Sequence, residues 1–168
     1  MNINLKLVPG DYTNEDAIHN LLNYIFDLDH TPLPIRFYGL LQIQRLPPTP
    51  NEIIAAFEDV HRTAAHTLPR QLWHLIITFP IVFDKPYGHY FYFADAVARL
   101  FTPEYPVCYA YHKDNKTTRH HHSHFHYAIS TSSIVPQAAP LDADKLKDYL
   151  QKIPLLARTF HINTVFIN

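Results

Sequence analysis

Cysteine is almost absent from the chain, which has only Cys108 among 168 residues. A single thiol cannot form an internal disulfide, so the fold must depend on an apolar core. Because 47% of the residues are hydrophobic, one domain spanning residues 1–168 can supply such a core. We therefore expect a single domain that folds without disulfide support.

Long hydrophobic runs are also missing. The stretches ITFPIVF and HYFYFADAVARLF are short and are interrupted by proline or polar groups, whereas a bilayer span needs roughly 20 apolar residues. The first segment, MNINLKLVPGDY, has no apolar region of the kind that directs secretion. We expect a cytoplasmic protein that does not insert into a membrane.

An excess of positive charge is the third absence, since the formal net charge is −1. Without a global positive field, the chain is not expected to bind nucleic acid tightly and without sequence preference. A basic groove can still exist in a neutral protein, and the thirteen histidines add positive charge below about pH 6.5. DNA is therefore not excluded as a substrate, but its affinity should depend on pH.

Hydrophobic periodicity predicts four helices and at least five strands. The helices are expected over residues 13–26, from Thr49 to just before Pro69, over about 87–101, and over 142–159 with an interruption near Pro154. The strands are expected over about 35–45, 73–79, 107–113, 122–131 and 163–168. This order favours an α+β fold, in which helices pack on one face of a mainly antiparallel central sheet.

The segment from 107 to 131 is rich in histidine and carries the clearest chemical pattern. His124 and His126 are two residues apart on a predicted strand, so they point to the same side. If the two predicted strands form a hairpin, His112 can supply a third imidazole. Three ligands would leave coordination positions open for a substrate. Asp114 would face the same side, and could orient a ligand or bind the metal itself.

An alternative interpretation is that HHHSHFH is an exposed tract that scavenges metal ions. We favour this interpretation for His120, His121 and His122, because they lie at the mouth of the hairpin and their spacing selects none of them. The alternating spacing of His124 and His126 instead favours an ordered site.

Three segments in succession carry a family resemblance. LLNYIFDLDHTPL resembles a nucleophile segment, WHLIITFP resembles the strand that precedes a metal motif, and PVCYAYHKDN followed by HFHYAIS resembles that motif. In this order, with ADAVARLF in the intervening helix, the chain resembles the relaxases, or mobilisation nucleases, of mobilisable plasmids and integrative elements. The resemblance is to the branch with a single catalytic tyrosine, within the His-hydrophobic-His (HUH) endonuclease superfamily.

The resemblance implies a relaxase-like palm fold and a metal-dependent, site- and strand-specific DNA nickase that acts during conjugative mobilisation. Tyr24 would be the nucleophile that forms a 5′-phosphotyrosine, His112, His124 and His126 the metal ligands, and Asp114 an assisting carboxylate. The implied cation is Mg²⁺ or Mn²⁺, although imidazoles bind Ni²⁺, Zn²⁺ or Co²⁺ more tightly. The implied partners are single-stranded or extruded DNA at an origin of transfer and accessory relaxosome proteins.

The chain departs from the family pattern in two places. Ser130 stands where the family usually has asparagine, and the insertion NKTTRHHHS lengthens the hairpin. Two other functions therefore stay open: a DNA-binding or accessory protein that does not nick, and a rolling-circle replication-initiation endonuclease.

Several residues have a second interpretation. Tyr24 is one of eleven tyrosines, and a tyrosine at a helix end is often a core residue with its hydroxyl at the surface. Arg36, Arg45 and Lys113 suit phosphate contacts or solvated surface charges equally. Other nucleophiles possible by composition are Tyr12, Tyr109, Tyr111 and Tyr127, although the last three lie on predicted strands. Residues expected in the core are Trp73, Phe79 and Phe83.

Overall fold

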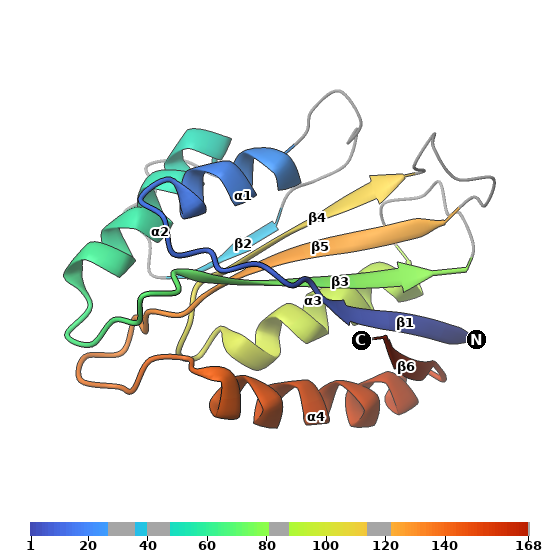
Figure 1. The fold of residues 1–168 in the computed structure, drawn as a ribbon. Coiled ribbons are helices and arrows are strands. Elements are labelled where there is room, and N and C mark those ends of the chain that lie inside the picture. The colour runs from blue at the N-terminus through green and yellow to red at the C-terminus, as the bar shows by residue number, and fades with distance from the viewer. Residues whose placement is uncertain (27–35, 40–47, 81–87, 114–121, 168) are drawn as a thin grey trace.

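The computed structural model describes residues 1–26, 36–39, 48–80, 88–113 and 122–167, apart from the side chain of Lys113 (Figure 1). A six-stranded sheet in the order β2-β4-β5-β3-β1-β6 forms its centre. The strands are β1 (Asn2–Leu7), β2 (Arg36–Tyr38), β3 (Leu72–Phe79), β4 (Val107–Lys113), β5 (Ser123–Ser130) and β6 (Asn163–Ile167). All neighbouring strands are antiparallel except β1 and β6, which are parallel. The expected α+β fold with a mainly antiparallel sheet is confirmed.

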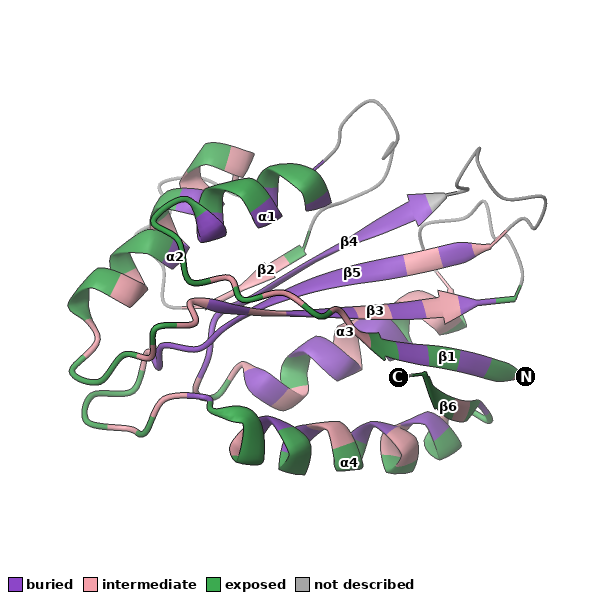
Figure 2. Cartoon of the chain, in the orientation of Figure 1, coloured by how far each residue is buried: buried purple, intermediate pink, exposed green. Residues whose placement is uncertain are grey.

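The helices cover both faces of the sheet. They are α1 (Ala17–Ile25), α2 (Pro50–Thr63), α3 (His89–Phe101) and α4 (Ala143–Thr159). Figure 1 shows α1 and α2 on one face and α3 and α4 on the other. The expectation that helices cover only one face is wrong, because β4 and β5 bury their side chains on both faces (Figure 2).

Two apolar cores result from this arrangement, one on each face of the sheet. Phe125 and Tyr127 point into the core beneath α3 and α4, whereas Cys108, Ala110 and Ala128 point into the core beneath α1 and α2. Small side chains on this second face let α1 approach the strands closely. The histidines of β4 and β5 continue the same face.

Helix α2 begins where the sequence predicts. Thr49 caps it, accepting a hydrogen bond from the Glu52 backbone, while the Glu52 carboxylate accepts one from the Thr49 backbone N–H at 2.6 Å. Pro50 occupies the first turn, where a missing N–H costs little. The helix ends at Thr63, well before Pro69, because Ala64 already has an extended backbone.

Other boundaries differ from the prediction. Helix α1 begins at Ala17 rather than at 13, because a turn precedes it in which the Ala17 N–H donates to the Asn14 carbonyl at 3.0 Å. Strand β2 ends at Tyr38, and residues 40–47 lie outside the described residues. The predicted interruption at Pro154 is wrong, since α4 runs through it. Buried residues on both sides of the proline offset the lost backbone hydrogen bond: Leu146, Tyr149, Ile153 and Ala157.

Strand β1 is an element that the sequence analysis did not predict. Its residues alternate between exposed and buried, with Ile3 and Leu5 fully buried against β3. This period of two is the signal that could have identified it. Among the helices of the described residues, none is long and apolar enough to cross a membrane.

Candidate metal centre

The hairpin of β4 and β5 brings three histidines together. His112 lies directly opposite His124, and His126 lies opposite Ala110, so all three side chains emerge on the face beneath α1. One nitrogen from each ring lies within 4.8 Å of the others. The ring centroids of His112 and His126 are 4.4 Å apart, and those of His124 and His126 are 4.9 Å apart. The predicted convergence of these residues is confirmed.

Helix α1 orients His112. Its Nε2 lies 2.9 Å from the carbonyl oxygen of Ile25, in the last turn of α1. A carbonyl can only accept, so Nε2 must carry the hydrogen. A neutral ring in this tautomer has its lone pair on Nδ1, the atom through which it would bind a cation.

The ring of His126 is almost completely buried, and its Nε2 has no hydrogen-bond partner. Its Nδ1 lies 2.8 Å from Nε2 of His74. A buried nitrogen without a partner is costly and needs an explanation. A divalent cation between the three rings would satisfy it, so these residues fit a metal ion.

Burial opposes protonation of two of the three rings, His124 and His126. Burial, together with the neighbouring His112, lowers the pKa of His124 to about 4. Burial lowers the pKa of His126 still further, helped by the three histidines around it. Neutral imidazole is the form that binds a metal, so burial favours the metal-binding form of these two rings.

His74 is a member of this cluster that the sequence analysis missed. It lies on β3, where Ile76 pairs with His126, so His74 shares the face of the three histidines. Its side chain is 4% exposed. Burial, then the neighbouring His112, lowers its pKa to about 4. The available signal was one histidine in the otherwise apolar strand WHLIITF.

Tyr24 lies on α1 with its ring against the cluster. Its ring centroid is 5.3 Å from that of His126 and 6.2 Å from that of His112. The side chain is nevertheless 56% exposed, so its hydroxyl is not confined to the core.

The other tyrosines lie elsewhere. Tyr109, Tyr111 and Tyr127 are buried on the opposite face, in the core beneath α3 and α4. Tyr12 contacts the cluster only through His74, with its hydroxyl 3.1 Å from Nδ1 of that ring. Of the candidate nucleophiles, Tyr24 is the one whose ring contacts both His112 and His126.

The remaining candidates are either outside the converging group of histidines or outside the described residues. Arg36 pairs with Tyr109 and therefore lies on the face opposite the histidines. Ser130 is buried, and its hydroxyl donates to the Ser132 carbonyl at 3.2 Å. His122 does not belong to the converging group. Candidates outside the described residues are Asp114, His120, His121, Arg45, Phe83 and the side chain of Lys113.

Two of the expected core residues are where the sequence predicts. Phe79 is fully buried. Trp73 packs against the same core, and its indole N–H donates to the Leu141 carbonyl at 2.8 Å.

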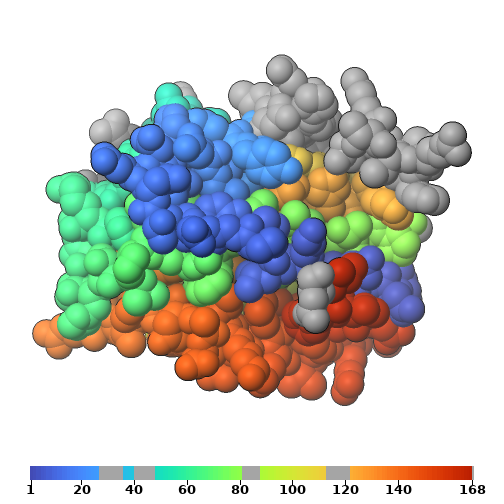
Figure 3. Space-filling view, viewed as in Figure 1, coloured from blue at the N-terminus to red at the C-terminus, as the bar shows by residue number. Residues whose placement is uncertain are grey.

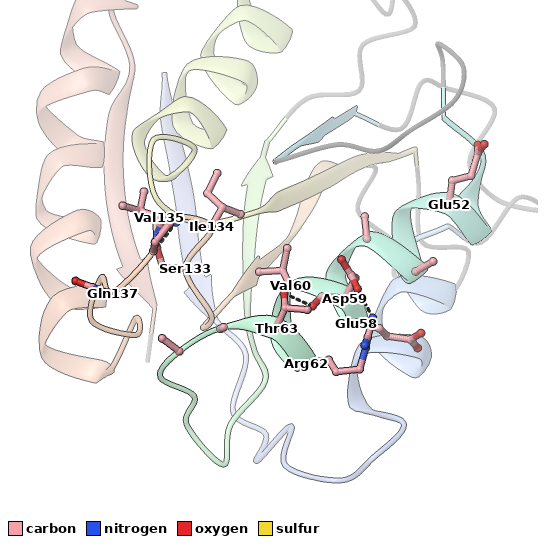
Figure 4. A pocket seen from close by; sticks show the side chains of 15 residues that line it. Glu52, Glu58, Asp59, Val60, Arg62, Thr63, Ser133, Ile134, Val135 and Gln137 are labelled. Carbon is pink, nitrogen blue, oxygen red and sulfur yellow. Dashed lines mark hydrogen bonds and ion pairs between the residues drawn. The ribbon is translucent and has the colours of Figure 1, made fainter.

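A groove of about 910 Å³ lies away from the histidines, between α2 and residues 133–137 (Figure 4). Its charged lining residues are Glu52, Glu58, Asp59 and Arg62, and no histidine lines it. It is therefore separate from the metal centre.

Comparison with protein-family models, with curated proteins and with solved structures found no match to this chain.

Proposed function

We propose that the protein is a metal-dependent DNA relaxase that nicks one DNA strand with Tyr24. One observation carries the proposal: an exposed tyrosine ring lies against three converging histidines, one of which has a buried nitrogen without a partner. The order of these residues along the chain is that of the relaxase motifs.

The reaction is a transesterification. The Tyr24 hydroxyl loses its proton and attacks the scissile phosphorus, the bond from phosphorus to the 3′ oxygen breaks, and that oxygen takes up a proton. The products are a free 3′-hydroxyl and a 5′-phosphotyrosine, which retains the phosphodiester bond energy for rejoining. A divalent cation in the site would neutralise charge developing on the phosphate oxygens.

The position of Tyr24 supports the proposed substrate class. Tyr24 is in the last turn of α1 with its ring against two histidines of the sheet, so in this proposal the scissile phosphate enters between α1 and the sheet. Single-stranded or extruded DNA can bring its backbone into such a narrow site. We assign Mg²⁺ or Mn²⁺ as the working cation, although Zn²⁺, Ni²⁺ or Co²⁺ would bind the imidazoles more tightly. We further propose that the protein recognises an origin of transfer together with accessory relaxosome proteins.

The test is formation of a covalent adduct. Wild-type protein with Mn²⁺ and single-stranded DNA carrying the host element's origin should form an adduct that survives denaturation. Tyr24→Phe should reduce adduct formation at least 100-fold, because the attacking oxygen is gone. Tyr92→Phe is the matched control, since Tyr92 is also exposed but lies on α3, across the sheet. Normal cleavage by Tyr24→Phe would contradict the assignment.

A protein that binds DNA without nicking it is the second candidate, favoured by Ser130, which stands where the relaxases usually have asparagine, and by Arg36 facing away from the histidines. It predicts binding of the origin strand without an adduct. Adduct formation on a replication origin, but not on a transfer origin, would instead identify a rolling-circle initiation endonuclease.

A further inference from the structure

A chain of hydrogen-bonding groups runs from the metal centre to the N-terminal segment. The His126 Nδ1 lies 2.8 Å from the His74 Nε2, and the His74 Nδ1 lies 3.1 Å from the Tyr12 hydroxyl. Both histidines are buried, at 1% and 4% exposure. These contacts join β5, β3 and the segment that follows β1.

Only one arrangement of hydrogens along this chain suits metal binding. If His126 binds a cation through Nε2, its Nδ1 must carry the hydrogen and donate it to His74. The His74 ring then accepts at Nε2, so its own hydrogen is on Nδ1 and is donated to the Tyr12 oxygen. Each group thus fixes the tautomer of the next.

Tyr12 is held in an unusual conformation at the end of this chain. Its φ of 45° is in the left-handed region, where a non-glycine residue is strained. The Tyr12 carbonyl accepts from the Gln71 N–H at 2.8 Å, and the Val8 N–H donates to the His74 carbonyl at 2.8 Å. Figure 3 shows this N-terminal chain (blue) packed directly against β3 (green). These backbone hydrogen bonds hold Tyr12 in the strained conformation, with its hydroxyl group against the His74 ring.

We propose that His74 and Tyr12 are positioning residues, which fix His126 in the tautomer and orientation that present Nε2 to the metal ion. The inference deepens the proposed function and rests on its metal site. His74 binds no ion itself in this role. Loss of a hydrogen-bond partner behind a ligating histidine typically lowers metal affinity 10- to 100-fold.

The test compares two replacements of His74 in the full chain. His74→Gln keeps an acceptor near the position of Nε2, whereas His74→Leu removes it. His61→Leu is the matched control, because the ring of His61 also makes a hydrogen bond to another side chain, the Ser132 hydroxyl at 2.9 Å, but lies outside the cluster. Zn²⁺ affinity is measured by competition with a chromophoric chelator. The tautomer of His126 is read from ¹⁵N NMR of the metal-free protein, and folding is checked by urea denaturation.

We expect His74→Leu to bind Zn²⁺ 10- to 100-fold more weakly than wild type, and His74→Gln and His61→Leu to stay within about threefold. His126 should be Nδ1-protonated in wild type and His74→Gln, and should lose that preference in His74→Leu. Tyr12→Phe should weaken binding less than His74→Leu.

Equal losses in folded His74→Leu and His74→Gln would overturn the inference in favour of simple packing. An unchanged His126 tautomer in His74→Leu would also overturn it. Absence of Zn²⁺ binding by wild type would instead refute the proposed metal site, and the NMR comparison would still decide whether His74 sets the His126 tautomer.

Discussion

Two of the three candidate ligands use different ring nitrogens for their hydrogen bonds to neighbouring residues. His112 uses Nε2 to contact the Ile25 carbonyl, whereas His126 uses Nδ1 to contact His74. In each ring the second nitrogen is the one through which we expect a metal to bind. The Ile25 carbonyl and the His74 ring therefore set the orientation in which His112 and His126 would bind a metal.

At this scale we predict unequal effects of removing histidines. His126→Ala should weaken Zn²⁺ binding at least 100-fold, since it removes one of three ligands, and His124→Ala should act similarly. His121→Ala, in the neighbouring tract, should change affinity less than threefold. Isothermal titration calorimetry measures all three. Equal losses would indicate that the histidines act as a scavenging tract.

The sequence predicts the three ligands because strand alternation and hairpin pairing place side chains by simple geometry. It does not predict His74, since its partner His126 is distant in sequence and the β3–β5 register is a property of the whole sheet. Which nitrogen faces the site is equally unpredictable, because it depends on the Ile25 carbonyl and on His74. The side chain of Asp114 belongs to the part that the structure does not describe.

The short strand β2 is joined to α3 through one carboxylate, that of Asp95. It has three residues and pairs only with β4 along the described chain. Asp95 of α3 accepts hydrogen bonds from Tyr38 of β2 and, at 3.1 Å, from Tyr109 of β4. Its other oxygen accepts from Arg99 at 2.7 Å. This carboxylate therefore fastens the edge strand to the helix beneath it.

We predict that Asp95→Asn destabilises the protein by about 1–3 kcal/mol, because the charge-assisted hydrogen bonds are lost. Burial alone would raise the pKa of Asp95, but the hydrogen bonds from Tyr38, Arg99 and Tyr109 outweigh burial and lower it. A lowered pKa stabilises the fold above the unfolded-state pKa of about 4, and this contribution disappears as pH falls through the folded-state pKa.

Urea unfolding at several pH values tests this prediction. The difference in unfolding free energy between wild type and Asp95→Asn should be largest above about pH 5 and should shrink below pH 4. A difference that is constant across this range would show that the Asp95 charge does not contribute.

Features whose signals are local in sequence are easier to predict than features that depend on packing between elements. The capping box at Thr49 and the buried face of α2 are local in sequence, so α2 begins where expected. The continuity of α4 through Pro154 is not local, because it depends on packing against the sheet and α3. The sequence also does not predict that helices cover both faces of the sheet, because this depends on how β4 and β5 pack between the two pairs of helices.

At the scale of the molecule, one sheet separates two cores that share its central strands. Because β4 and β5 contribute alternate residues to both, neither core can form without the other. The expected single domain should then unfold cooperatively. Trp73, the only tryptophan, lies at the start of β3 beside the larger core and reports on the sheet.

We predict that tryptophan fluorescence and far-ultraviolet circular dichroism give the same urea midpoint, because the helices lose their packing surface when the sheet opens. Two midpoints would contradict this prediction and indicate that one helix pair unfolds separately. Tyr92→Phe provides a control in which stability should be nearly unchanged, since Tyr92 is 67% exposed.

We infer that His112, His124 and His126 hold one divalent cation beside Tyr24. Anomalous diffraction from crystals soaked in Mn²⁺, and separately in Zn²⁺, tests it most directly. We predict one strong peak bonded to a nitrogen of each of the three rings at about 2.0–2.3 Å, with His126 bound through Nε2. A peak on His120 to His122 alone, or no peak between the three rings, would contradict the account.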